Sequence, residues 1–79
     1  MQVGEIVIVC DKGRPFNGTY EHPAVVTRVW GSGEPTPTVN VKVLPDCGEP
    51  YDATSIQHWK NTAYGSKNHY RLRDEAVAL

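Results

Sequence analysis

Three strand-like segments, each ended by a strong turn signal, constrain the fold of this chain more than any other feature. They span residues 6–10, 23–30 and 38–44. In the third segment Val39, Val41 and Val43 alternate with polar residues, the period-2 pattern of a strand with one buried and one solvated face. The breaker-rich stretch 31–37 cannot be crossed by a helix, so it predicts an antiparallel hairpin between the second and third segments.

Two weaker segments complete the expected fold. Residues 51–58 alternate less clearly, 61–68 has the composition of a loop, and 70–73 is expected to form a short closing strand or 3₁₀ turn. Five short strands predict one all-β domain over 1–75, a partly open five-stranded barrel, because closure protects the edges of a small sheet. We favour a Src-homology-3-like barrel over the oligonucleotide-binding type, which needs longer strands. Residues 76–79 are expected to be a C-terminal tail.

Size and charge narrow the classes of function. A chain of 79 residues buries only about 60 to 65% of its unfolded surface, which leaves room for one thin core. The net charge of −1 gives no overall attraction to nucleic acid or membrane, so an anion-binding surface would have to be local. No apolar run approaches the length of a membrane span, and a cytoplasmic protein without a membrane partner is expected.

The residue types that usually carry catalysis or metal binding lack the required spacing. Cys10 ends an apolar strand, where a thiol is normally inert, and Cys47 lies beside an acid that disfavours its thiolate. His22, His58 and His69 are not spaced as metal ligands, and the short glycine turns do not continue as a phosphate-binding loop. We therefore expect no cofactor, no metal and no enzymatic activity.

A basic and aromatic segment spans residues 58–73 and contains no acid. Interleaved cations and rings can neutralise phosphates and stack on bases, which suits a small nucleotide or a single-stranded nucleic acid. The alternative, favoured because so small a core needs its large rings, is that Trp59 and Tyr70 cap the open end of the barrel above a solvated basic rim. The candidate binding residues are Trp59, Lys60, Tyr64, Lys67, Tyr70, Arg71 and Arg73.

One loop and one strand end provide the other candidate contacts. The long loop 11–22 carries Phe16 and Tyr20, an exposed pair of rings if the loop is solvated. Strict alternation places Arg28 on one face with Ala24, Val26 and Trp30. Arg28 would then either stack on an exposed aromatic ring to present a binding surface or pair with an acid such as Glu5 or Asp52, and the ion pair is favoured. Trp30, at the end of this segment, is also a candidate contact.

The order of these motifs resembles a family of small phage and prophage proteins of uncharacterised role. The matching stretches are GEIVIV at 4–9, HPAVVTRVW at 22–30, VNVKVLPDCGEP at 39–50 and TSIQHW at 54–59. The family shares an xPAxVTxVW strand, a VNLTVF-like strand followed by D-x-G, and a T-S-V-x-H segment. The resemblance covers residues 3–59 and none of its motifs is catalytic. Its members often end in a W-H-W-P-like segment, where this chain has NHYRLRD at 68–74. The resemblance implies a phage-type accessory gene.

These observations lead to two expected functions. The first is a non-catalytic module that docks onto a host or phage protein through loop 11–22 and the tip 31–37, for instance as a counter-defence or host-modulating protein. The alternative is a protein that binds or sequesters nucleic acid or a small nucleotide through 58–73. In a barrel this small an exposed edge strand could also pair with a second copy of the chain.

Overall fold

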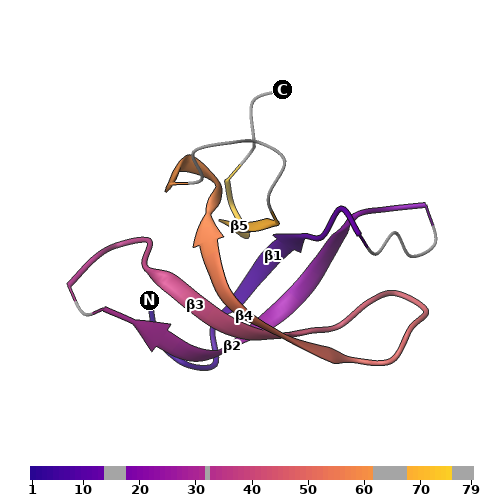
Figure 1. Ribbon diagram of the computed structural model, residues 1–79, viewed down its shortest axis with the longest axis horizontal. Coiled ribbons are helices and arrows are strands. Elements are labelled where there is room, and N and C mark those ends of the chain that lie inside the picture. The colour runs from indigo at the N-terminus through magenta and orange to yellow at the C-terminus, as the bar shows by residue number, and fades with distance from the viewer. Residues whose placement is uncertain (14–17, 32, 62–67, 76–79) are drawn as a thin grey trace.

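The computed structural model describes residues 1–13, 18–31, 33–61 and 68–75. Within these ranges the chain forms five strands and one short 3₁₀ helix, η1, which confirms the predicted all-β class (Figure 1). Their bounds are β1 Ile6–Cys10, β2 Glu21–Trp30, β3 Thr38–Val43, β4 Tyr51–His58, η1 Trp59–Asn61 and β5 His69–Leu72. Residues 76–79, expected to be a tail, lie outside the described residues.

The strands form a closed barrel in the order β1-β2-β3-β4-β5, with β5 beside β1. Consecutive strands from β1 to β4 are antiparallel, and β5 is antiparallel to β1. Strand β5, which follows η1 in the chain, runs parallel to β4 and pairs with it only at Gln57–His69 and His58–Tyr70. This short parallel contact completes a ring that we expected to be partly open.

The core follows the alternation seen in the sequence. Val39, Val41 and Val43 of β3 are buried, and so are Val7 and Val9 of β1, which confirms the period-2 prediction for β3. Complete burial of such a side chain contributes about 1.5 to 3 kcal/mol, so these valines account for much of the driving force. The other buried hydrophobic residues are Ala24, Val26, Ile56 and Tyr70.

Strand β2 starts two residues earlier than predicted, at Glu21, and it therefore contains Pro23. The carbonyl of Pro23 accepts a hydrogen bond from the Leu44 amide at 2.8 Å, just beyond the end of β3. In an antiparallel strand the amide and carbonyl of one residue face the same neighbour, so the N–H that proline lacks would face Leu44, one residue beyond the end of β3. The proline therefore leaves out only a reciprocal bond at the very end of the β2–β3 ladder, and its N–H is not needed for pairing with β1.

A β-bulge in β2 divides the residues that simple alternation places together. Val26 pairs with Val41 and Arg28 pairs with Asn40, which leaves Thr27 as the extra residue. Val26 is buried before the bulge, whereas Arg28 is exposed after it. The sequence expectation that Arg28 and Trp30 share a face with Ala24 and Val26 was therefore wrong, and this shift creates the exposed site described next.

Candidate functional site

Trp30, at the end of β2, keeps 41% of its surface exposed although its ring is held in place. Its indole Nε1 donates a hydrogen bond to Oδ1 of Asn40 at 2.8 Å. The guanidinium carbon of Arg28 lies 3.9 Å from the centre of the ring, within cation–π range. Arg28, Trp30, Asn40 and Ser55 are called the Trp30 platform below. It is an oriented aromatic surface on the outside of the barrel.

Asn40 sits between two bulges and joins three strands. It follows the β2 bulge in register, and on its other side the pairing with β4 shifts between Val39 and Val41. Asn40 Oδ1 accepts a second hydrogen bond, from the Ser55 amide at 2.9 Å. Ser55 adopts a φ of 56°, a left-handed conformation that costs a non-glycine residue about 1 to 2 kcal/mol. Strain of this kind clusters at functional sites.

Sequence reasoning does not single out Asn40. Its only signal is its place on the solvated face of β3, in an alternation that is otherwise explained by the buried valines. The bulges that give this residue its two donors leave no compositional trace, because a single extra threonine or serine fits any strand.

The expectation that Arg28 pairs with an acid was wrong. Glu5 lies 3.9 Å from the N-terminal amine, and Asp52 pairs with Lys42 at 3.4 Å. Arg28 stacks on Trp30 instead, because the bulge turns both side chains to the same outer face. The alternative that the sequence left open, an arginine stacked on an exposed ring, is the one that the structure contains.

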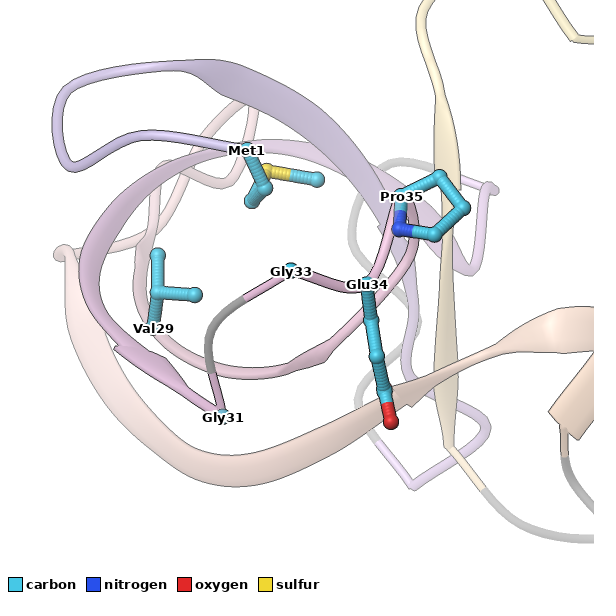
Figure 2. Close-up of a pocket in the computed structure, with 6 residues that line it drawn as sticks. All are labelled: Met1, Val29, Gly31, Gly33, Glu34 and Pro35. Atoms are coloured by element: carbon cyan, nitrogen blue, oxygen red, sulfur yellow. The ribbon is translucent and has the colours of Figure 1, made fainter.

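A pocket of about 870 Å³ opens beside the platform. Figure 2 shows the side chains of Met1 and Val29 pointing into this opening, while the Glu34 side chain points away from Met1. Val29 lies between Arg28 and Trp30 in the chain but packs against the core, so the pocket and the platform occupy two sides of the same strand end. The lining residues are Met1, Val29, Gly31, Gly33, Glu34 and Pro35.

Two of the candidate residues of segment 58–73, Tyr70 and Arg71, are engaged in the fold. The side chain of Tyr70 is completely buried, and its hydroxyl donates to the Pro37 carbonyl at 2.6 Å. Tyr70 therefore has no exposed ring face on which a base could stack, and that expectation was wrong for this residue. Arg71 Nε donates to Glu21 Oε2 at 3.0 Å, and Arg71 Nη1 donates to the Glu75 carbonyl at 2.8 Å. Tyr64 and Lys67 lie outside the described residues.

The remaining described candidates of this segment are Trp59, Lys60 and Arg73. Trp59 is half-buried in η1, with the Lys60 ammonium 5.3 Å from its ring centre. Arg73 is exposed and lines a second pocket, of about 620 Å³, together with Glu5 and Asp74. Two carboxylates beside this arginine oppose the binding of a phosphate there.

A buried histidine holds the end of β5. His58 Nε2 lies 2.7 Å from Glu75 Oε1, and His58 Nδ1 accepts the amide N–H of Lys60 at 3.3 Å. Because Nδ1 acts as an acceptor, the hydrogen bonds assign the ring proton to Nε2. The Leu72 amide donates to the same Glu75 oxygen at 2.9 Å, and this bond, followed by that of His58, lowers the pKa of the Glu75 carboxyl.

Asp11, which directly follows β1, accepts side-chain hydrogen bonds from two distant parts of the chain. Its carboxylate accepts hydrogen bonds from the Tyr51 hydroxyl at 2.7 Å and from Asn68 Nδ2 at 3.1 Å. Tyr20, 49% exposed, directly precedes β2, so it lies at the other end of that strand from Trp30. Phe16 lies outside the described residues. The structure therefore does not bring Tyr20 together with the connection between β2 and β3.

The two thiols, Cys10 and Cys47, are not joined in a disulfide. Burial is the largest cause that raises the pKa of the Cys10 thiol, which keeps the thiol in its protonated, unreactive form. In the ranges that the structure describes, no group of three or more His, Cys, Asp or Glu residues is arranged to hold a metal ion. None of the helices described there is long and apolar enough to cross a membrane.

Comparisons with known proteins give no relative from which a role could be transferred. No protein-family model, no curated protein and no solved structure matches the chain. The candidate site therefore rests on its own geometry, an exposed indole held between an arginine and an asparagine at the rim of a closed barrel.

Proposed function

We propose that this chain is a non-catalytic protein-binding module that docks onto a partner protein through the Trp30 platform and the adjoining pocket. The observation that carries this proposal is the exposed indole of Trp30, which is hydrogen-bonded to Asn40 and in contact with the Arg28 guanidinium. Tryptophan and arginine are the residue types most enriched among the few that dominate binding energy at protein interfaces. A barrel that needs its large rings for packing would otherwise gain little from leaving this one in water.

Preorganisation supports the same proposal. Binding costs about 0.5 to 1.5 kcal/mol for each flexible side chain that must be immobilised. The hydrogen bonds from Trp30 and Ser55 to Asn40 already fix the ring, so part of that cost is met during folding. The neighbouring pocket offers apolar contacts from Met1 and Val29 to an anchor residue of the partner.

The biological setting belongs to the same proposal. A host or phage protein as partner, a counter-defence or host-modulating role and a cytoplasmic location in a bacterial cell are supported by the resemblance of residues 3–59 to small phage proteins. The Src-homology-3-like class of the barrel is supported by its size and by its consecutive strand order.

The test is a pull-down from bacterial lysate at low and high salt, followed by mass spectrometry of what is retained. Wild type is compared with Trp30→Ala and with Tyr20→Ala, a matched control because Tyr20 is an exposed ring of similar accessibility at the far end of β2. We expect a protein that stays bound at high salt, is lost with Trp30→Ala and is kept with Tyr20→Ala. Retention that is insensitive to Trp30→Ala would contradict the proposal.

The same experiment addresses the alternative function. Among the described cations of segment 58–73, Lys60 and Arg73 are exposed, and they favour nucleotide binding only if they act together. Recovery of RNA or nucleotide that is released as salt rises, and that is lost with Lys60→Gln and Arg73→Gln, would make this segment the working site.

A further inference from the structure

We propose that the Trp30 platform recognises a carboxylate side chain of a partner protein, presented next to a flat apolar residue such as proline or an aromatic. This inference rests on the proposed function and names the chemistry of the partner. Arg28 would bind the carboxylate, and the exposed part of the Trp30 indole would pack against the flat residue.

The first step of the argument is the state of the Arg28 guanidinium. Its central carbon lies 3.9 Å from the centre of the Trp30 ring, and no described residue accepts a hydrogen bond from it. Arg71, by contrast, donates to a carboxylate and to two backbone carbonyls. A guanidinium carries five N–H donors in a fork that matches a carboxylate. Arg28 therefore presents donors that no described part of the fold uses.

The second step is the choice between a carboxylate and a phosphate backbone. A nucleic acid is bound through several cations placed along its charged chain. The next outward residue of β3 after Asn40 is Lys42, and it is already paired with Asp52 at 3.4 Å. On the described outer faces of β2 and β3, Arg28 is therefore the cation that has no acidic partner, in a chain of net charge −1, which suits a single carboxylate better than a phosphate chain.

The third step is the fixed orientation of the ring. Asn40 holds the indole edge and is itself held by the strained Ser55, so the stacked pair keeps one geometry before a partner arrives. A planar ring beside a planar fork can contact a flat residue and a carboxylate at the same time. This is the geometric basis for expecting the two features next to each other in the partner.

The test is selection from a displayed library of random ten-residue peptides on the folded protein. Selection on wild type, with counter-selection on Trp30→Ala, is expected to enrich Asp or Glu within one or two residues of Pro, Tyr, Phe or Trp. The affinity of the best peptide should fall about tenfold with Arg28→Gln, the loss expected for one charge-assisted pair. Arg28→Lys, which keeps the charge without the fork, should lose less. Arg73→Gln, an exposed arginine elsewhere, should leave the affinity unchanged.

Each other outcome overturns a different part of the account. Peptides that depend on Trp30 but show no acidic enrichment and no loss with Arg28→Gln would overturn the carboxylate inference and leave the docking function standing. Equal enrichment on wild type and on Trp30→Ala, with both proteins folded by circular dichroism, would overturn the docking function and the inference together. Binding of a ten-nucleotide oligothymidine that is lost with Arg28→Gln and with salt would replace the peptide by a nucleic acid and overturn both.

Discussion

The strand end at Arg28 and Trp30 and the segment from His58 to Arg73 have similar composition but opposite structural roles. Both contain tryptophan and arginine. In the later segment Tyr70 is packed in the core and Arg71 is bound to Glu21 and to backbone carbonyls. At the strand end, the ring and the guanidinium face solvent and contact each other. A cluster of rings and cations therefore indicates a binding site only where the fold leaves them unused.

The first prediction contrasts the two rings by stability. Tyr70→Ala removes a completely buried ring and its hydrogen bond to Pro37, so it should lower the free energy of unfolding by about 3 to 5 kcal/mol. Trp30→Ala removes an exposed ring, and we expect a loss of about 1 kcal/mol or less. Urea denaturation of both variants measures the difference. A larger loss for Trp30→Ala would break the contrast.

The second prediction uses alkaline pH to probe the same buried ring. Burial is the largest cause that raises the pKa of Tyr70 to about 12, above the value of 10 expected when unfolded. The folded state therefore favours the neutral phenol. The stabilisation that this provides is complete below pH 10 and is lost as pH rises towards 12, by up to about 3 kcal/mol. In unfolding curves from pH 9 to 12, subtraction of the Tyr70→Phe curve should isolate this loss, and equal slopes for the two proteins would contradict it.

The third prediction concerns the support of the platform. Asn40→Ala should lower the free energy of unfolding by about 1 kcal/mol, because it removes the acceptor of two exposed hydrogen bonds. It should also free the Trp30 ring, which is measured as lower fluorescence anisotropy in a Trp59→Phe background. Asn61→Ala, which removes a single exposed bond to the Thr36 carbonyl, is the control and should leave the anisotropy of Trp30 unchanged. Unchanged anisotropy in Asn40→Ala would mean that Asn40 does not orient the ring.

The smallest expected effect is that of acid on the hydrogen bonds of Glu75 with His58 and Leu72 at the end of β5. Hydrogen bonds from the Leu72 amide and from His58 lower the pKa of Glu75 below 4.5. The corresponding stabilisation is present above pH 4.5 and is lost as pH falls through the lowered folded-state pKa, by less than about 1 kcal/mol at this partly exposed position. Unfolding curves from pH 6 to 2.5 should show a shallower acid loss for Glu75→Gln than for wild type. Identical curves would show that the hydrogen bonds of Glu75 contribute nothing to the free energy of unfolding.

The sequence predicts the parts of this structure that follow from regular patterns. Alternation in 38–44 identifies the buried valines of β3, and the turn signals separate the strands correctly. It does not predict the position of Arg28, because one extra residue at Thr27 reverses the face of everything that follows in β2. Closure of the ring depends on a two-pair parallel contact between β4 and β5, which local sequence cannot encode.

The candidate site was predicted in part. Trp30 was among the candidate contacts and is exposed, whereas Tyr70 carried the same kind of signal and is buried. Whether a ring is exposed or buried depends on which residue from another part of the chain contacts it. Asn40 reaches Trp30 from the neighbouring strand, and Pro37 reaches Tyr70 from a distant segment. Such pairs are set by register and closure, so they follow only from the folded chain.

The most direct test of the central claim observes both tryptophans in one experiment. The ¹⁵N-labelled protein gives a separate indole N–H signal for Trp30 and for Trp59, and the peptide selected on wild type is added in steps. The account predicts that the Trp30 signal shifts to saturation while the Trp59 signal stays in place. A shift of the Trp59 signal with an unmoved Trp30 signal would contradict the account, because it would place the binding surface in segment 58–73 instead of at the Trp30 platform.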